Sequence, residues 1–336
     1  MNKIRSATVS FLALLALLVL ILDAKTASIG AYKGIQLCIT NFIPSILPFI
    51  ILTKLICLNS TYNCVRLFGP IEKLAGIPSG AGKIMLLGFI GGYPLGAQCI
   101  EDAYNCGELK LHDAKRMLGF CSNAGPAFIF GVLSPMFDSL LIPIYLMIIH
   151  ISSAIIVSVI LPRKAVGACT AVNKQTTSFA EIVESSVRSV SIISCWIVLF
   201  RVILEFMNKW FMYNIPSCFK VFIFGILELT NGIFMLKEIS HVGTMFILSS
   251  FMLGFGGLCV GLQTISCTKR TGLGLYFPGK VLQGLLSVLL AYLAHFFVLP
   301  QKDHLYISHM QTAFLLMVIT VFCIFLRTRK KVVAFT

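Results

Sequence analysis

The sequence alternates long apolar stretches that contain no charged residue with short polar segments. The clearest stretches are each close to the roughly 20 residues that an α-helix needs to cross the hydrocarbon core of a membrane. They lie at 6–22, 34–53, 117–137, 139–162 and 309–326, with further apolar runs at 189–204, 218–236, 242–267 and 281–300. The pattern predicts an all-α, polytopic membrane helix bundle. The first stretch follows Lys3 and Arg5 and also fits a signal peptide, but we favour an uncleaved span.

Part of the chain is duplicated at a fixed offset of 165 residues. Residues 91–100 (GGYPLGAQCI) and 256–265 (GGLCVGLQTI) share the skeleton GGxxxGxQxI. When this alignment is continued without a gap, nine of the positions from 91 to 122 are identical to those 165 residues later, where composition alone would give roughly two. The predicted organisation is an N-terminal span and loop at 1–33, repeat unit one at 34–162, a polar linker at 163–184, repeat unit two at 185–326 and a basic tail at 327–336.

Each unit carries a glycine-rich apolar segment whose centre is unsuited to a continuous helix. Gly91, Gly92 and Pro94 interrupt the segment of unit one, and Gly256 and Gly257 interrupt that of unit two. Broken backbone at membrane depth is tolerated only where protein or a water-filled cavity covers it. We therefore predict a re-entrant helical hairpin in each unit, with a glycine-rich packing face between continuous helices as the alternative.

The number of crossings predicts how the two units are related. If each hairpin does not cross, three crossings remain per unit, and an odd number inverts the second unit relative to the first. Inverted repeats with discontinuous helices near the bilayer midplane recur among secondary transporters. With the N-terminus inside, the basic loops at 59–83, 101–116 and 163–188 also fall inside, as expected. The basic cluster at 327–331 then lies outside unless 218–236 also crosses, which the sequence leaves open.

Composition agrees with membrane residence. Hydrophobic residues make up 57% of the chain and charged residues 12%, against about a quarter charged in soluble domains. The net charge of +14 comes from basic residues scattered through short loops. This distribution favours the lipid bilayer as a partner and argues against nucleic acid, which needs a continuous basic face. The twelve cysteines form no CxxC pair, so we interpret them as apolar filler and predict no metal site.

Polar residues inside the apolar segments are the candidates for binding a solute. Gln98 and Gln263 occupy equivalent places after the hairpin glycines. An amide offers donors and an acceptor to a solute, and a helix–helix contact is the alternative. Ser122, Asn123 and Gly125 precede a proline that interrupts an apolar span of unit one and frees carbonyl groups there. Only the serine has a counterpart in unit two, which suggests that unit one alone kept this binding chemistry.

Glu228 lies within the apolar run 218–236, is followed by Thr230 and Asn231, and aligns with Glu72 of unit one. A carboxylate at membrane depth costs about 2.5–3.5 kcal/mol on insertion scales and is a functional candidate by default. It would bind a coupling sodium ion or carry a coupling proton. The alternative, to which we give equal weight, is that Glu228 lies at the membrane interface or forms an ion pair.

Other ionisable residues favour structural roles. Arg201 and Glu205 are four residues apart on a predicted helix and are expected to form an ion pair. His150 is expected to be a core residue with its hydrogen bonds satisfied. The sequence has no nucleophile–base triad, phosphate-binding loop or HExxH motif, so we predict that the chain is not an enzyme and uses no organic cofactor.

Several of these segments together resemble one family. Residues 91–97 (GGYPLGA), 122–131 (SNAGPAFIFG) and 228–232 (ELTNG), with the unit-two glycines and glutamine, resemble the YlbJ-type sporulation integral membrane proteins. Those proteins belong to the wider group with nucleoside-recognition (Gate) domains. Residues 43–49 (IPSILPF) resemble the proline-rich early span of the family. The resemblance covers the chain from about 34 to 327.

The resemblance implies a role in the sporulation of endospore formers, in a cell or forespore membrane, and transport of dipicolinic acid. Helix N-termini at hairpin tips suit the carboxylates of this planar dianion. We predict a transporter of a small anionic solute that works by alternating access. The alternatives are a nucleoside-like or other small-solute facilitator and a non-transporting membrane scaffold; the coupling ion and a homo-oligomeric state stay open. The predicted substrate-binding residues are Gly91, Gly92, Tyr93, Gln98, Ser122, Asn123, Gly125, Glu228, Thr230, Asn231, Gly256, Gly257 and Gln263.

Overall fold

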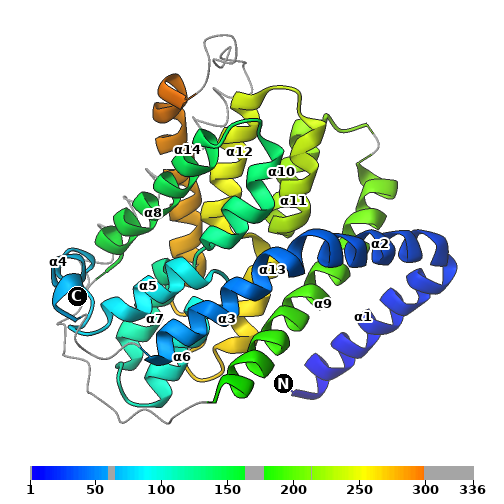
Figure 1. Ribbon diagram of the computed structural model, residues 1–336. Coiled ribbons are helices and arrows are strands. Elements are labelled where there is room, and N and C mark those ends of the chain that lie inside the picture. The colour runs from blue at the N-terminus through cyan, green and yellow to red at the C-terminus, as the bar shows by residue number, and fades with distance from the viewer. Residues whose placement is uncertain (1, 60–64, 163–177, 213, 299–336) are drawn as a thin grey trace, which may run out of the picture.

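The computed structural model of the protein describes residues 2–59, 65–162, 178–212 and 214–298 (Figure 1). All the secondary-structure elements assigned in these ranges are helical, which confirms the predicted all-α class. The α-helices are α1 (Asn2–Leu22), α2 (Ala24–Leu37), α3 (Ile43–Asn59), α4 (Val65–Ala75), α5 (Gly82–Gly91), α6 (Leu95–Asn105), α7 (Leu111–Cys121), α8 (Leu141–Ile160), α9 (Phe179–Phe211), α10 (Ser217–Leu227), α11 (Leu229–Met235), α12 (Val242–Phe255), α13 (Gly257–Cys267) and α14 (Tyr276–Val298). Short π- and 3₁₀-helical segments are η1 (Cys38–Phe42), η3 (Ala127–Leu133), η4 (Ser134–Met136) and η5 (Leu236–Glu238).

Among the described residues, five helical segments are long and apolar enough to cross a membrane. Large apolar side chains stay exposed along several of them, for example Leu52 and Leu199, and lipid is the environment that such surfaces need. The chain is therefore a helical multi-pass membrane protein. The five segments are Ala24–Leu55, Leu141–Ile160, Phe179–Phe211, Val242–Cys267 and Tyr276–His295.

Two predicted spans are interrupted in the structure. The segment 117–137 is not one helix, because α7 ends at Cys121 and regular structure resumes only at η3. Pro126, just before η3, has no N–H to continue the hydrogen-bond ladder. The segment 218–236 divides at Glu228 into α10 and α11, which pack against each other, so this run folds back on itself.

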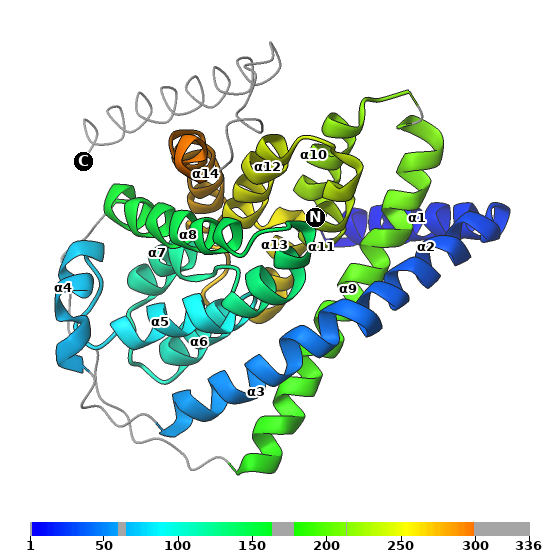
Figure 2. The ribbon, with the colours of Figure 1, turned by 45° about the horizontal axis from the view of Figure 1, so that its top comes forward.

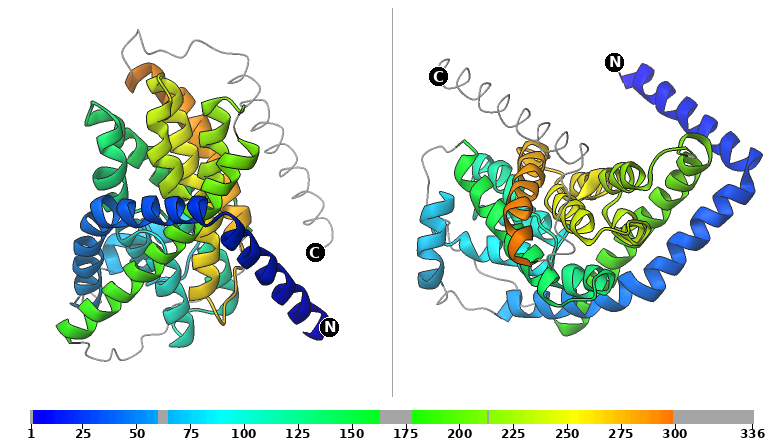
Figure 3. Two further views of the ribbon diagram at one scale, coloured as in Figure 1. Left: turned by 90° about the vertical axis from the view of Figure 1, so that its right-hand side faces the viewer. Right: turned by 90° about the horizontal axis from the view of Figure 1, so that it is seen from above.

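Four of the predicted segments remain to be compared with the structure. The predicted first span, 6–22, lies in α1, which projects away from the other helices in both views of Figure 3. The predicted span 309–326, the tail 327–336 and most of the linker 163–184 lie outside the described residues.

Helix α2 and the unit-one helix α3 pack along α9, with which unit two begins. Figure 2 shows α2 and α3 running beside the long helix α9. Gly30 and Gly34 of α2, one turn apart, face this contact. A Cβ atom on Gly34 would lie 2.9 Å from the Cα of Val198, and one on Gly30 would lie 2.8 Å from the Cα of Val202. The absence of side chains thus lets the two backbones touch, as small residues at this spacing do between membrane helices.

Helix breaks in the two units fall at equivalent places, although the folding around them differs. α5 ends before Gly92, which has a φ of +76°, and α12 ends before Gly256, which has a φ of +81°. α5 and α6 then fold back on each other, so that a Cβ on Gly96 would lie 3.0 Å from the Cα of Gly88. α12 and α13 instead form one apolar segment long enough to span a membrane.

The duplication is also visible in the helix that follows each break. α14 begins 165 residues after α7 begins and ends 165 residues after η3 ends. In unit one this stretch is interrupted by residues 122–126 (SNAGP), whereas unit two has the apolar sequence 287–291 (SVLLA) there and stays helical. α14 packs against α7, α8 and α12 and so joins the two hydrophobic cores of the protein.

The glycine contact between α2 and α9 predicts a local effect on stability. Gly34→Leu would force the two backbones apart, and we expect it to destabilise the protein by about 1–3 kcal/mol, the usual cost of overpacking. The measurement is the thermal midpoint of the detergent-purified protein, followed by size-exclusion chromatography. Ala31→Leu is the matched control, because Ala31 lines an open apolar groove between α1, α2 and α9. Equal midpoints for both variants would contradict the tight contact.

Candidate functional site

A small cavity lies where helix breaks from both units meet. Its volume is about 40 Å³, which is room for a few water molecules. The wall combines segments that are far apart in the sequence: η1 and α3, the α5–α6 turn, the interruption after α7, α9, the α10–α11 turn and α13. The lining residues are Phe42, Ile46, Gly91, Gly92, Tyr93, Ala124, Gly125, Ala127, Phe128, Ile193, Glu228, Leu229, Thr230, Val260 and Gln263.

The cavity gathers a large part of the predicted binding residues. Those that line it are Gly91, Gly92, Tyr93, Gly125, Glu228, Thr230 and Gln263. Gln98, Ser122, Asn123, Asn231, Gly256 and Gly257 were predicted with them but are not among the lining residues, although all except Gln98 and Ser122 lie next to one in sequence or contact. The structure thus brings seven of the thirteen predicted residues to one space, and their role in binding a solute stays a prediction.

Two glycines hold the unit-one side of the cavity together. Gly92, in the α5–α6 turn, lies against Gly125 in the interruption after α7. A Cβ on Gly92 would lie 3.0 Å from the backbone nitrogen of Gly125, and a Cβ on Gly125 would lie 2.8 Å from the carbonyl oxygen of Ile90. The positive φ of Gly92 adds a second reason for glycine at that position. Two stretches of non-helical backbone thus form one wall of the cavity.

Glu228 is the carboxylate that lines the cavity, and its side chain is buried. It caps the N-terminus of α11, accepting hydrogen bonds from the backbone N–H of Thr230 (3.0 Å) and of Asn231 (2.6 Å). The Asn231 side-chain nitrogen donates a third, at 2.7 Å. Three donors converge on the carboxylate and favour its charged form, whereas its burial favours the neutral form.

The aligned residue of unit one plays a comparable structural part. Glu72 accepts hydrogen bonds from the backbone N–H of Gly80 (3.0 Å) and of Gly82 (2.9 Å) at the start of α5. Both units therefore use a buried glutamate to satisfy backbone N–H groups at a turn. Only Glu228 does so on the wall of the cavity.

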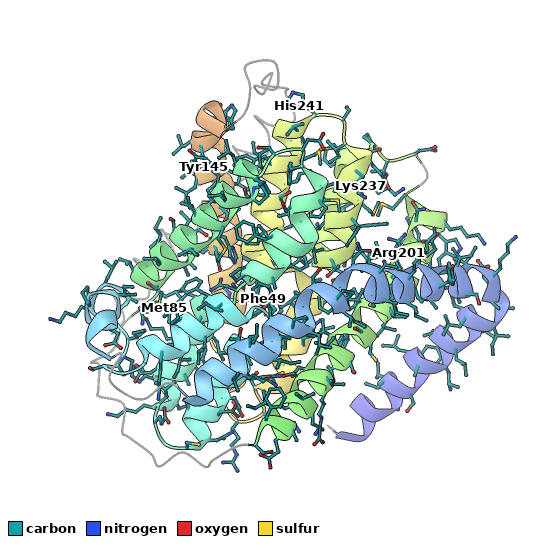
Figure 4. The ribbon with its side chains drawn as sticks, in the orientation of Figure 1. Phe49, Met85, Tyr145, Arg201, Lys237 and His241 are labelled. Atoms are coloured by element: carbon teal, nitrogen blue, oxygen red, sulfur yellow. The ribbon has the colours of Figure 1, made fainter. Side chains whose placement is uncertain are left out.

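A chain of polar contacts leads from Glu228 to the protein surface. Asn231 accepts a hydrogen bond from Arg201 at 3.2 Å, and Arg201 pairs with Glu205 at 3.4 Å. Glu205 in turn contacts the half-exposed Lys33 at 2.8 Å. The predicted Arg201–Glu205 ion pair is therefore confirmed, and Figure 4 shows Arg201 on α9. The carboxylate of the cavity is electrostatically connected to groups that water reaches.

The outer end of this chain borders a wider depression. Glu205 lines it together with Lys209 and Lys220, and its volume is about 420 Å³. Asn231 follows the cavity residue Thr230, and its partner Arg201 pairs with Glu205 of the depression, so the Arg201–Asn231 contact links groups beside the two spaces.

The two equivalent glutamines have different surroundings. Gln263 on α13 is buried and lines the cavity, with its amide nitrogen 3.4 Å from the sulfur of Cys259. Gln98 on α6 is half-buried, and its amide nitrogen lies 3.5 Å from the sulfur of Cys267. The difference follows from the fold-back of α5 and α6, which carries Gln98 to the contact between α6 and α13.

Tyr93 connects the two units across the cavity. Its hydroxyl donates a hydrogen bond to the carbonyl oxygen of Leu253 on α12 at 3.2 Å. A Cβ on Gly256 would lie 2.8 Å from the same hydroxyl oxygen. Gly256 thus supports the site by leaving space for Tyr93, while the neighbouring Gly257 lies against the α10–α11 turn.

Asn123 lies behind the cavity wall and binds a lysine that the sequence analysis did not select. Its side-chain oxygen accepts hydrogen bonds from Lys280 (3.0 Å) and Gln283 (2.9 Å), and its nitrogen donates to the carbonyl oxygen of Phe120. Lys280 is fully buried within α14. Lys280 directly precedes the predicted apolar run 281–300, so the hydropathy pattern places it at the flank of that span. The structure instead buries it inside the membrane-spanning helix, where an ionisable residue is a functional candidate by default.

His150 lies in the core, as expected, and its Nε2 atom has a hydrogen-bond partner. Its Nε2 atom accepts a hydrogen bond from the backbone N–H of Ala124 at 3.1 Å, and its Nδ1 atom lies 3.4 Å from the amide nitrogen of Gln283. The His150 ring therefore accepts a hydrogen bond from a backbone N–H that has no acceptor within a helix, because the chain is not helical after α7.

Outside the candidate spans, Glu101 connects α6 to the loop before α14. It accepts hydrogen bonds from the backbone N–H of Arg270 (2.7 Å) and from the hydroxyl of Thr271 (2.6 Å). Burial by itself would raise the pKa of Glu101, but these hydrogen bonds outweigh it and hold the pKa below the usual glutamate value. The Glu101 carboxylate therefore contributes most to the stability of the fold when it is charged.

The fold and the site together define a helical multi-pass membrane protein with a small, partly polar cavity at its helix breaks. No family model, no curated protein and no solved structure matches this chain. The resemblance to the YlbJ-type proteins therefore stays a prediction from motifs.

Replacing the Glu228 carboxylate tests its capping role. In Glu228→Gln one oxygen acceptor becomes an NH₂ donor that faces backbone N–H groups, so we expect a loss of about 1–3 kcal/mol in stability. The measurement is thermal unfolding in detergent. Glu238→Gln, an exposed change ten residues further along, is the control and should leave the midpoint unchanged. A Glu228→Gln midpoint equal to that of wild type would show that the cap contributes little.

The lowered pKa of Glu101 predicts acid sensitivity. A depressed pKa adds stability above the unfolded value, which is about 4.3, and that stability is lost as pH falls through the folded pKa. We expect Glu101→Gln to be less stable than wild type at pH 7, with the difference narrowing as the pH is lowered below about 4. Thermal midpoints across pH measure this. A difference that stays constant with pH would argue against the charged hydrogen bonds.

Proposed function

We propose that the protein moves a small solute across the membrane and that the cavity is the central part of its binding site. The observation that carries the proposal is the convergence of helix breaks from both units on one space within a bundle of candidate spans. Backbone groups at such breaks lack helical partners and can bind a solute instead. The proposal involves no chemical conversion of the solute.

The duplication supports an arrangement for this transporter. We propose that the two units are inverted relative to each other in the membrane, with α5–α6 as a re-entrant hairpin and α12–α13 as its counterpart. The fold-back at Gly92 and the break at Gly256 support this assignment, and the spanning length of 242–267 makes the counterpart a broken crossing in the present structure. Because the two units differ in this way, α5–α6 and α12–α13 would move differently during transport.

The size of the cavity supports alternating access. At about 40 Å³ it is far smaller than the roughly 300–1,000 Å³ of typical small-molecule pockets. A solute can bind only if the wall moves, and the wall is built from short helical pieces joined at glycines. The structure thus fits a closed state, from which movement at the Arg201–Asn231 contact would open the cavity toward the depression beside Glu205.

For the substrate we propose a small anionic solute, with dipicolinic acid as the first candidate. The assignment to dipicolinate, to sporulation and to a forespore membrane rests on the motif resemblance. Physical support comes from the aromatic side chains Tyr93 and Phe128 on the wall and from the half-buried Arg201 and the buried Lys280 near it. Glu228 opposes an anion when it is charged, and a coupling sodium ion or proton at Glu228 would remove that opposition.

A nucleoside-like solute is the second candidate. Glu228, Thr230 and Gln263 line the cavity and offer acceptors and donors that suit ribose hydroxyls or a base edge. This alternative keeps the same site and changes only its ligand. A scaffold without transport activity would make the same cavity side chains dispensable.

The duplicated glutamines provide a matched test of the proposed site. Gln263→Ala should reduce saturable uptake of labelled dipicolinate into proteoliposomes by about tenfold, because losing a contact worth about 1.4 kcal/mol changes binding by that factor. Gln98→Ala removes the equivalent side chain of unit one, which does not line the cavity, and should leave uptake near the wild-type rate. Equal losses in both variants would place the site elsewhere.

The choice of solute separates the alternatives in the same assay. Uptake of a labelled nucleoside in place of dipicolinate would support the second candidate. Absence of uptake for both solutes under sodium and proton gradients, with protein shown to be folded, would contradict transport and favour the scaffold.

A further inference from the structure

Lys280 is a buried lysine whose surroundings are neutral. It lies in the second turn of α14 with a fully buried side chain. Its Nζ atom donates hydrogen bonds to the side-chain oxygens of Asn123 (3.0 Å) and Gln283 (2.7 Å). It also lies 5.1 Å from the centroid of the Tyr93 ring, within cation–π range. Amides and a ring stabilise an ammonium group without neutralising it.

The titratable groups around Lys280 carry no negative charge. The elements packed against it contribute the Cys121 thiol from α7, the His150 imidazole from α8 and the Tyr93 phenol from the α5–α6 turn, while α12 contains no titratable residue. Nε2 of His150 accepts a hydrogen bond, so the ring is neutral. Within the described part of the chain, no carboxylate forms an ion pair with Lys280.

An ammonium group in such a place is unstable unless something compensates its charge. Burial of a single charge without a counter-ion is costly, and a group so placed either gives up its proton or binds an ion of opposite sign. The first outcome leaves a neutral amine whose two N–H groups can still donate to the two amide oxygens. The second requires an anion close to Nζ.

The candidate cavity is the nearest place for that anion. Tyr93 lines the cavity and has Lys280 beside its ring. Asn123 binds Lys280 and directly precedes Ala124 and Gly125, which also line the cavity. The ammonium group is thus separated from the cavity by one ring and one short stretch of backbone. A widening of the cavity on this side must move one of these two, because both belong to its wall.

We propose that Lys280 takes up one proton when an anionic solute binds in the cavity and releases it when the solute leaves, so that the solute is carried together with a proton. The inference rests on the proposed transport function and deepens it by naming the charge of the solute and the coupling ion. The step balances as amine plus proton plus anion, giving an ammonium–anion pair. By linkage, protonation raises the affinity for the anion by the same factor by which the anion raises the affinity for the proton.

Calorimetry on the full-length protein in detergent tests the proton step directly. Dipicolinate is titrated into the protein at one pH in two buffers with different heats of ionisation, and the difference between the heats gives the number of protons taken up. We expect up to one proton per bound anion for wild type and none for Lys280→Met. Lys115→Met is the matched control, because Lys115 is the repeat-equivalent lysine and is exposed on α7, and it should take up protons as wild type does.

A second variant keeps the test independent of whether Lys280→Met folds. Lys280→Arg carries a permanent charge, so we expect it to bind dipicolinate without proton uptake. In proteoliposomes an imposed proton gradient should then speed wild-type uptake at least threefold and leave Lys280→Arg uptake unchanged.

The outcomes separate this inference from the transport proposal. Wild-type binding and uptake with no buffer-dependent heat would overturn proton coupling and leave transport standing. Proton uptake that persists in folded Lys280→Met would show that another group takes the proton. Failure of wild type to bind or carry dipicolinate would overturn the anion assignment, and the nucleoside assay above then decides whether transport itself survives.

Discussion

The constraint on which this structure depends is that broken backbone inside an apolar environment must find partners within the protein. The break after α7 leaves the Ala124 N–H without a helical acceptor, and His150 supplies one. The α10–α11 turn leaves N–H groups that the Glu228 carboxylate accepts. Because the breaks lie against one another, their partners gather in one region, and that region contains the cavity.

Buried ionisable groups also need partners within the protein, and Glu228 and Lys280 differ in the partners that they have. Glu228 receives three hydrogen bonds and connects through Asn231 and Arg201 to groups near the surface. Lys280 has only neutral partners among the described residues. A carboxylate that is fully satisfied suits a fixed structural part, whereas an ammonium without a counter-ion suits a group whose charge changes. The two sides of the cavity therefore differ in how readily their charge can be altered.

Duplication produced two units that no longer do the same work. Unit one keeps a polar interruption at 122–126, while the equivalent stretch of unit two continues as helix α14 and brings Lys280 to that interruption. The equivalent glutamines have also separated, because α5 and α6 fold back while α12 and α13 run on. One cavity is thus built from unlike contributions of two related halves, which gives it a polar side and an aromatic side instead of internal symmetry.

The sequence by itself determined the helical membrane class, the duplication, the positions of the helix breaks and the Arg201–Glu205 pair. These depend on local composition and on spacing along one helix, which the chain order contains. Only the tertiary structure decided that 218–236 divides into two helices that fold back on each other, that Gln263 and not Gln98 faces the cavity, and that Lys280 is buried beside Asn123. These depend on which segments pack together across more than a hundred residues, and packing between distant segments leaves no periodic signal in the sequence.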